Sequence, residues 1–438
     1  MYLCGPTVYD NAHLGHGRSA CAFDVIRRYL IYKGYEVIFI SNYTDIDDKM
    51  IKRANEEKIT VKELADKIIP EYEKDYSALN ILKPNKQPKA TEHIETMIKM
   101  VKALEEKGVA YELTDGVYFD ITKFSNYGKL SGQNLEELQA GARITKDEKK
   151  KNPQDFVLWK KSKENEPSWD SPFGAGRPGW HIECSAMNFD IFGETIDIHG
   201  GGLDLIFAHH ECEIAQSESY TGKTFVKYWL HNGFVKVDNE KMSKSLGNFF
   251  LLKDIFKKYD PLVVRYLLIS QHYRNPIDFS DTVLNQAKNS LKRIQEFVFR
   301  LDNYKNYSAQ SFVNLQQILN SGKENFEKYM DNDFDTSGAL SALFELIKEV
   351  NKLIDEQKLT QNDIKEIKNL TKKFDSVFGI LKTTADEKLP EEITNLIKER
   401  EKYRQEKNWT KADEIRNELL KKGYEIEDSS EGTKCRKI

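Results

Sequence analysis

The segment 208–218, AHHECEIAQSE, gathers histidine, cysteine and glutamate side chains that can each bind a metal ion. If the segment is helical, His209 and Glu213 share a face at i, i+4, whereas His210 and Glu211 point elsewhere. His209 with Cys212, at i, i+3, is the competing pair. The spacing differs from the H-E-x-x-H of zinc proteases. Because one helical turn cannot supply a tetrahedral site, further ligands must come from elsewhere in the chain.

Two other short motifs could contact a nucleotide. HLGH, His13 to His16, lies where a turn leads into a helix after a strand, and α/β proteins bind phosphate oxygens at such helix N-termini. Gly15 would let a flat base approach the backbone closely. KMSKS, Lys241 to Ser245, lies in a polar loop just before Gly247. Taken alone, the first motif is also compatible with two surface histidines and the second with a solvated lysine turn.

The elements around these motifs predict an α/β protein. The sequence reads as a strand at 1–4, a helix from 13 that Gly34 ends, and a buried strand at 37–41. Such a βαβ unit implies a parallel sheet with a right-handed crossover. Residues 60–110 read as helical and 110–170 as an irregular, lysine-rich insertion, after which a strand near 195–205 and a helix from 208 resume the pattern.

The C-terminal third reads as helical. Apolar residues recur in steps of three and four from Leu284 to Leu301 and again from Ala339 to Leu353, as in amphipathic helices of a bundle. The tail from Thr394 reads as a helical hairpin that leads to a short strand.

The composition indicates a folded chain of two to four domains, because 438 residues exceed what one core buries and 39% of them are hydrophobic. Five scattered cysteines make no disulfide framework, which indicates a reducing cytoplasm. No apolar run approaches the roughly 18 residues of a membrane span, and no signal peptide is recognised, so we expect no membrane association. The net charge of −4 provides no global basic field, so any nucleic acid would be held by local patches.

HLGH followed by KMSKS on such a frame resembles the class I aminoacyl-tRNA synthetases, with Leu14 where the family usually has isoleucine. Five blocks in order narrow the resemblance to the cysteinyl-tRNA synthetases, and it extends across the whole chain: CGPTVYDNAHLGH, NYTDIDDK, GRPGWHIECSAMN, HGGGLDLIFAHHECEIAQSE and KMSKSLGN. Family members carry a further segment ahead of the first block, so we expect either an upstream start or a missing edge strand.

The resemblance implies an α/β fold with a Rossmann-like parallel-sheet catalytic domain and an insertion, followed by an α-helical bundle and a small C-terminal anticodon-binding domain. We expect the first half of the catalytic domain at 1–95, a connective insertion at 96–170, the second half at 171–225, the KMSKS-loop and stem-contact region at 226–283, the bundle at 284–385 and the anticodon-binding domain at 386–438.

The resemblance also implies one active-site zinc ion per chain, bound by two cysteines, a histidine and a glutamate. The motifs place these ligands at Cys4, Cys184, His209 and Glu213. On this assignment His210, Glu211 and Cys212 are bystanders, with Cys212, where relatives usually have asparagine, as the local alternative ligand. Zinc would select the thiolate of substrate cysteine over the hydroxyl of serine.

By the same resemblance the substrates are L-cysteine, ATP with Mg²⁺, and tRNA(Cys), and we expect a cytoplasmic monomer. The cysteine pocket is expected to contain Gly5, Thr44, Trp180 and His199. The ATP site is expected to contain His13, Gly15, His16, Gly202, Asp204 and Lys244. His13 and His16 would donate hydrogen bonds to phosphate, and Lys244, helped by Lys241, would neutralise the leaving pyrophosphate.

In the tail, the resemblance assigns anticodon reading to Arg404, Trp409, Asp413 and Asp428. Carboxylates can accept from the N1 and N2 donors of guanine, while tryptophan and arginine can stack on an unpaired base. Cys435 stands where relatives commonly have tryptophan. Two other functions compete: a cysteine-activating ligase that acts on a small amine, and a catalytically silent tRNA-binding or zinc-stabilised module. The tail block around Trp409 speaks against the first, and the intact HLGH and KMSKS motifs speak against the second.

Overall fold

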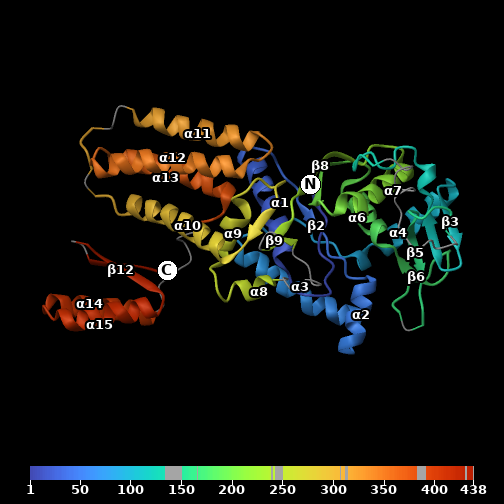
Figure 1. Ribbon diagram of the computed structural model, residues 1–438, viewed down its shortest axis with the longest axis horizontal. Coiled ribbons are helices and arrows are strands. Elements are labelled where there is room, and N and C mark those ends of the chain that lie inside the picture. The colour runs from blue at the N-terminus through green and yellow to red at the C-terminus, as the bar shows by residue number, and fades with distance from the viewer. Residues whose placement is uncertain are drawn as a thin grey trace. The chain divides into compact units, whose positions relative to one another are not determined.

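The computed structural model describes residues 1–133, 150–164, 166–237, 240–241, 250–305, 307–310, 314–381, 391–429 and 432–437 (Figure 1). The chain divides into two compact units, Met1–Leu381 and Lys382–Ile438. Among the described residues, no helix is both long enough and apolar enough to cross a membrane.

A parallel four-stranded sheet lies at the centre of the first unit. Its strand order is β2 (Ile40–Ser41), β1 (Tyr2–Leu3), β7 (Ile196–Gly202) and β8 (Val226–Asn232). Helix α1 (Leu14–Tyr32) connects β1 to β2, which confirms the predicted βαβ unit and the parallel sheet. The carboxyl ends of β1 and β7 therefore meet at one edge, where ligand sites of α/β proteins form.

Helices surround this sheet. After β2 come α2 (Asp48–Glu57), α3 (Val61–Ala78), a 3₁₀ turn at Ala90–Glu92 and α4 (Ile94–Glu106). A second 3₁₀ turn, Ile121–Lys123, lies within the insertion. Helix α6 (Trp180–Phe192) precedes β7, and a π-helical turn at Ile206–His210 leads from β7 into α7 (Glu211–Thr221). The expected helix from 208 is thus present, but its first turn is wider than an α-helical turn.

The region 110–170 is not irregular, as the sequence had suggested. It supplies three strands of an antiparallel sheet, β3 (Ala110–Leu113), β4 (Gly116–Phe119) and β5 (Phe156–Lys161), and β6 (Gly176–Pro178) adds the fourth strand beside β5. Every residue of β4 is buried, so no alternation of apolar and polar residues marks this strand in the sequence. Helices α4, α6 and α7 pack between this sheet and β1 around a shared apolar core.

A small third sheet leads toward the KMSKS segment. Its order is β10 (Glu240–Lys241), β9 (Val235–Val237) and β11 (Ile277–Phe279), with β10 antiparallel and β11 parallel to β9. Helices α8 (Leu252–Ile255) and α9 (Pro261–Ile269) lie between β10 and β11 in the sequence.

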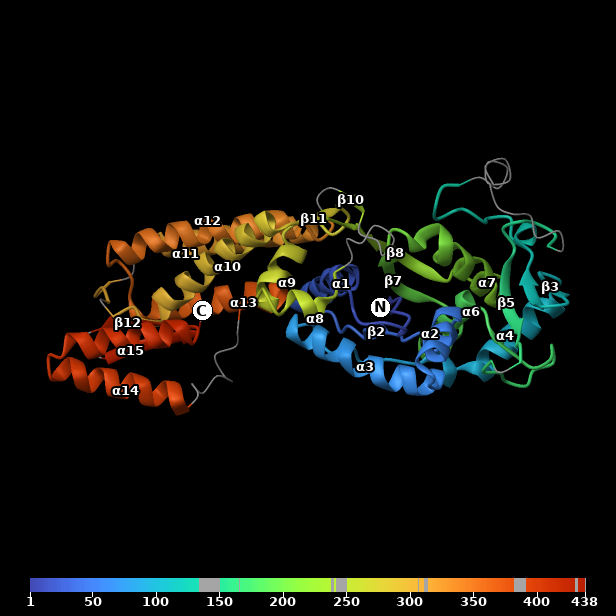
Figure 2. The ribbon, with the colours of Figure 1, turned by 60° about the horizontal axis from the view of Figure 1, so that its bottom comes forward.

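The predicted helical bundle is confirmed. It consists of α10 (Asp281–Asp302), α11 (Leu315–Asp331), α12 (Thr336–Asp355) and α13 (Gln361–Phe378), and Figures 1 and 2 show its helices side by side. Its apolar interior is continuous with the core around α1, α3 and α9. Buried Arg265 joins the two parts, because its guanidinium donates to the carbonyl oxygens of Phe378 at 2.7 Å and Leu79 at 2.9 Å and to Asp24 at 2.6 Å.

The second unit contains the expected helical hairpin, α14 (Glu391–Gln405) and α15 (Trp409–Lys421). Beyond the single strand expected, β12 (Tyr424–Ser429) pairs with a second strand, β13 (Gly432–Lys437). Ile393, Ile415 and Leu419 bury the hairpin against β12.

Candidate active site

Four potential metal ligands meet at the carboxyl end of the central sheet. Cys4 directly follows β1, Cys184 lies in α6, His209 in the π-turn and Glu213 in α7, and their ligand atoms all lie within 4.8 Å of one another. The two Sγ atoms are 3.7 Å apart, and Cys4 Sγ is 3.5 Å from Glu213 Oε1. Ligands bonded to a tetrahedral zinc ion at 2.0–2.3 Å lie about 3.3–3.8 Å from one another. The donor set and its spacing therefore fit zinc.

A second ligand set overlaps the first. Cys4 and Glu213 also lie within 4.8 Å of His199 and His210. His199 Nε2 is 2.9 Å from Glu213 Oε2, and His210 Nε2 is 3.5 Å from Cys4 Sγ. The prediction that His210 points away was wrong, because it assumed α-helical spacing. The wider π-turn, typical of functional sites, brings His209 and His210 to the same carboxylate.

Burial and mutual contact shift the proton affinities of this cluster. The contact with Cys4 Sγ lowers the pKa of Cys184 to about 6 in spite of burial, so its thiolate is favoured at neutral pH. Burial opposes the charge of His209, but the carboxylate of Glu213 at 3.0 Å outweighs it and raises the pKa to about 10. Burial likewise opposes ionisation of Glu213, and His199 and His209 hold its pKa well below the usual range. Protonated His209 supplies the positive charge that this buried thiolate–carboxylate pair requires.

Trp180 and His181 cover His209. The Trp180 ring stacks on the His209 ring with centroids 4.2 Å apart, and 37% of the tryptophan remains exposed, so it is not a core residue. His181 Nδ1 is 2.9 Å from His209 Nδ1, and burial lowers the pKa of His181 to about 3. Sequence reasoning missed His181, although it stands within the block GWHIEC.

Glu211 and Cys212 face the insertion rather than the cluster. Glu211 is fully buried, and its carboxylate accepts hydrogen bonds from the backbone amides of Gly128, Leu130 and Ser131 at 2.6–3.1 Å. Cys212 Sγ lies 3.5 Å from the Tyr127 hydroxyl. Among the described residues Cys212 belongs to neither ligand set, so the i, i+3 pair with His209 is not formed.

The other residues expected in the cysteine pocket surround this cluster. The Thr44 hydroxyl donates to Glu183 Oε2 at 2.8 Å, and both side chains are buried. Gly5 donates its amide to Asn42 Oδ1 at 2.8 Å. A Cβ at Gly5 would lie 1.6 Å from the Asn42 carbonyl oxygen, so only glycine fits. His199 stacks on Trp229 with centroids 4.6 Å apart.

The HLGH motif forms the N-terminus of α1. His13 is the N-cap, and the His13 and His16 rings stack with centroids 3.5 Å apart. Each ring accepts the other residue's backbone amide at Nδ1, at 3.3 Å, and His16 Nδ1 is also 3.2 Å from the Tyr72 hydroxyl. In the neutral rings the proton therefore lies on Nε2. Gly15 lies in the first turn of α1, partly exposed.

The remaining expected ATP contacts come from two other segments. Gly202 ends β7, and a Cβ there would lie 2.4 Å from Asp204 Oδ1, whose residue is exposed. Lys241 ends β10, in which its backbone pairs with Lys236 of β9. Lys244 lies outside the described residues.

Comparisons with known proteins agree with this geometry. Residues 1–289 match the family of class I (C) tRNA synthetase catalytic domains, residues 325–382 match the DALR domain, and residues 386–436 match the anticodon-binding domain of cysteinyl-tRNA ligases. The cysteine–tRNA ligase of Carboxydothermus hydrogenoformans is 49% identical over 442 residues, covering 100% of this chain and 95% of that protein. The chain belongs to the cysteinyl-tRNA synthetase family.

Other relatives support the family and the fold. The cysteine–tRNA ligase of Thermodesulfovibrio yellowstonii is 49% identical over 458 residues, covering 99% of this chain and 94% of that protein. The solved methionyl-tRNA synthetase of Mycobacterium tuberculosis, in complex with methionyl-adenylate, aligns with a TM-score of 0.62 at 16% identity, covering 86% of this chain and 89% of that one. At this identity the likeness shows the class I fold alone.

The anticodon-binding domain of this cysteinyl-tRNA synthetase family member brings two of the four expected residues together. The Arg404 guanidinium lies 5.8 Å from the Trp409 ring centroid, and 57% of Trp409 is exposed. Asp413 lies one turn further along α15 and is exposed. The backbone of Asp428 lies in β12, opposite Thr433, and Cys435 lies opposite Ile426; the side chains of Asp428 and Cys435 lie outside the described residues.

Proposed function

We propose that the chain activates L-cysteine with Mg²⁺-ATP and transfers it to the terminal adenosine of tRNA(Cys). The observation that carries the proposal is the convergence of Cys4, Cys184, His209 and Glu213 beside the helix that begins at HLGH. Membership in a family whose relatives are named cysteine–tRNA ligases supports it. We also propose that the protein acts as a cytoplasmic monomer with the domain limits given above.

The four ligands would hold one zinc ion. When bound, zinc would supply a Lewis acid with an affinity for thiolate sulfur that the hydroxyl of serine cannot match. Such selectivity is needed, because a hydrophobic pocket separates close analogues by only about 10- to 200-fold. Trp180, stacked on His209 and partly exposed, would form the wall of the pocket.

Thr44 would orient the α-ammonium group of cysteine. Its hydroxyl hydrogen is committed to Glu183 Oε2, so the oxygen lone pairs are what it offers to a ligand. Lone pairs suit a donor such as an ammonium group. This arrangement favours an amino acid whose α-amino group is protonated.

The phosphate chemistry falls to the two signature motifs. A carboxylate oxygen of cysteine attacks the α-phosphorus of ATP, and the bond to pyrophosphate breaks. His13 and His16 carry their protons on Nε2, which makes both rings donors toward phosphate oxygens. Lys241 and Lys244 would neutralise the leaving pyrophosphate, while Gly15, Gly202 and Asp204 would bind adenosine. The 2′-hydroxyl of the terminal adenosine then attacks the activated carbonyl and releases AMP.

Two assays test the proposal. Purified protein should contain about one zinc ion per chain and catalyse cysteine-dependent ATP–pyrophosphate exchange, with serine rejected at this step. Absence of exchange would favour the non-catalytic module. Exchange without charging of tRNA(Cys) would favour the ligase that acts on a small amine.

A further inference from the structure

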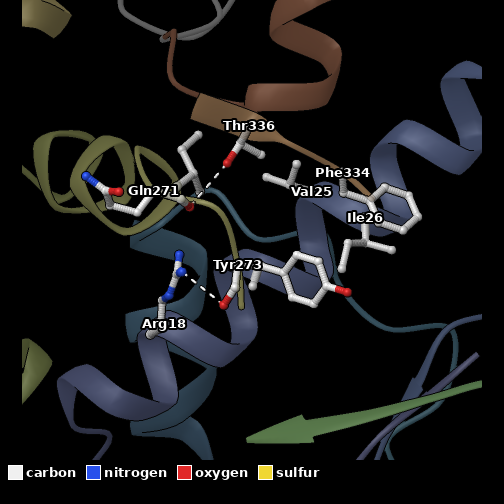
Figure 3. Close-up of a pocket in the computed structure, with 9 residues that line it drawn as sticks. Arg18, Val25, Ile26, Gln271, Tyr273, Phe334 and Thr336 are labelled. Carbon is white, nitrogen blue, oxygen red and sulfur yellow. Dashed lines mark hydrogen bonds between the residues drawn. The ribbon is translucent and has the colours of Figure 1, made fainter. Parts of the chain in front are cut away.

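A buried arginine follows the HLGH motif on the same helix. Arg18 is 1% exposed, and its guanidinium donates to four backbone carbonyl oxygens of a single stretch of chain. These are the carbonyls of Leu268, His272 at 2.9 Å, Tyr273 at 3.1 Å and Asn275 at 3.3 Å. Figure 3 shows the bond from Arg18 to Tyr273. Among the described residues Arg18 makes no ion pair, so the backbone carbonyls replace its lost hydration.

The stretch that Arg18 holds continues directly into the sheet that carries Lys241. Residues 270–276 connect α9 to β11, β11 pairs with β9, and β9 pairs with β10. Gly233, which connects β8 to β9, donates its amide to the Tyr273 carbonyl at 2.8 Å. A Cβ at Gly233 would lie 2.5 Å from the Asn275 carbonyl oxygen, so the two segments are in direct backbone contact. The Tyr273 carbonyl therefore accepts hydrogen bonds both from Arg18 of α1 and from Gly233, which precedes β9.

The other end of the KMSKS segment is tied to α1 directly. The Leu14 amide donates to the Phe250 carbonyl at 3.0 Å, and the Leu252 amide donates to the Ala12 carbonyl at 2.9 Å. His13 and Leu251 form an antiparallel bridge. The segment that leaves KMSKS is therefore placed by the backbone of the HLGH motif. The segment that enters it packs against α1 through apolar contacts, and Arg18 adds hydrogen bonds from α1 to the neighbouring residues 268–275.

The described surroundings of Arg18 leave room for little more than water. The cavity beside it measures about 10 Å³ and is lined by apolar side chains that include Val25, Ile26 and Phe334 (Figure 3). That volume admits at most one water molecule. Residues around the start of α12 hold the same stretch from the other side. The Thr336 hydroxyl donates to the Gln271 carbonyl at 3.3 Å, and the Tyr273 hydroxyl donates to Asp333 at 2.9 Å.

We propose that Arg18 is a positioning residue for the adenylation step: it fixes residues 272–275 and, through β11 and β9, the backbone position of Lys241, at which the KMSKS motif begins. This inference rests on the proposed function, because it requires that the KMSKS lysines act on pyrophosphate. Arginine suits the role because one planar group carries five donors in a fixed fork, whereas lysine offers a single ammonium.

The first experiment measures cysteine-dependent pyrophosphate exchange in Arg18→Met and Arg18→Lys. Misplacement of a reacting group by about 1 Å can cost on the order of 100-fold, so we expect kcat to fall by about 10- to 100-fold in Arg18→Met and less in Arg18→Lys. Zinc content and the KM for cysteine should stay unchanged, because within the described part of the chain Arg18 contacts neither the ligands nor the pocket. If Arg18→Met does not fold, Arg18→Lys carries the same measurement.

Arg27→Met is the matched control for stability. Arg27 lies on the same helix and donates to the carbonyls of Leu82 at 3.2 Å and Lys83 at 2.9 Å, far along the chain from KMSKS. It should lower thermal stability as Arg18→Met does and leave the kcat of the folded enzyme within about twofold of wild type, as for sites outside the mechanism. Equal kcat losses in both variants would overturn the inference, since a general structural role would then explain them.

A double-mutant cycle with Lys244→Ala completes the test. If Arg18 acts through the KMSKS segment, Arg18→Met should cost little further activity once Lys244 is absent. Full additivity would overturn the inference. Normal pyrophosphate exchange in Lys244→Ala would instead contradict the proposed role of KMSKS. Impaired exchange in Lys244→Ala together with normal exchange in Arg18→Met would contradict the role of Arg18 alone.

Discussion

The ligand cluster at the end of the central sheet and the helical bundle are both buried, yet they are built in opposite ways. In the cluster Cys4, Cys184, His209 and Glu213 come from separate elements and turn polar atoms toward one another. In the bundle the interior is apolar, with the Phe326 and Phe374 rings stacked at 4.2 Å. Polar burial costs free energy, whereas apolar burial supplies it. The comparison therefore assigns chemistry to the first region and stability to the second.

The largest effect is expected in the cluster. Cys184→Ser and His209→Ala should each lose bound zinc and lower cysteine activation by at least about 1,000-fold, roughly 4 kcal/mol. Metal analysis and pyrophosphate exchange on the same preparations check this. Cys212→Ser is the control and should keep both, because its sulfur faces Tyr127. The ligand assignment would be wrong if Cys212→Ser lost the zinc and Glu213→Gln kept it.

His210→Ala sharpens the same test, because two overlapping ligand sets are present. If zinc is held by the set with Cys184 and His209, His210→Ala should retain the metal. Loss of zinc in His210→Ala with retention in His209→Ala would assign the ion to the set with His199 instead.

In the bundle, Phe326→Ala should reverse the pattern. The side chain is fully buried against Phe374 and Phe378, so its removal should cost about 3–5 kcal/mol of unfolding free energy. Exchange activity per folded molecule should stay near that of wild type at 25 °C. Urea denaturation and exchange assays measure the two quantities, and Glu324→Ala, exposed on the same helix, should change neither. A specific loss of exchange in Phe326→Ala would break the comparison.

The anticodon-binding unit extends the comparison to a region that should affect only the second step. Trp409→Ala should lower kcat/KM for tRNA charging by about 10- to 100-fold, since stacking on an unpaired base contributes roughly 1–3 kcal/mol. Asp413→Ala should act in the same direction. Pyrophosphate exchange should be unchanged in both, and Glu414→Ala removes a neighbouring carboxylate as a control. Parallel losses in exchange and charging would point to a folding defect instead.

The sequence predicted some of these regions better than others, because different interactions stabilise them. The period of apolar residues from Leu284 to Leu301 specifies a bundle helix without further information, and α10 spans those residues. The strands of the insertion escaped prediction, because Gly116–Phe119 is buried on both faces and shows no alternation. Tertiary context decides such segments.

The sequence likewise predicted only part of the candidate site. Motifs located the ligands, but spacing alone left His209 with either Glu213 or Cys212, and the π-turn that turns His210 inward has no periodic signal. Arg18 gave no signal either, because its partners are backbone carbonyls of residues about 250 positions later, and no side chain marks them.

Asp75 is a buried carboxyl group outside the ligand cluster, so it tests whether buried polar groups away from the site also lower stability. It lies in α3, is 3% exposed, and its Oδ2 has no hydrogen-bond partner among the residues that the structure describes. Burial, with a smaller contribution from Glu71, raises its pKa from 3.8 to about 6. The folded state therefore binds this proton more tightly than the unfolded state, so the contribution of Asp75 to stability is present below about pH 4 and is lost as the pH rises to about 6.

Asp75→Asn should remove that loss, because the amide stays neutral at every pH. We expect the variant to be about 1–2 kcal/mol more stable than wild type at pH 7.5 and nearly equal to it at pH 4. Urea denaturation at both pH values gives the two differences. If the variant is less stable than wild type at pH 7.5, the ionised carboxylate must have a partner whose interaction outweighs the desolvation cost of burying the charge. Asp75 would then belong with the polar groups that this fold retains for a purpose, as it retains Glu213.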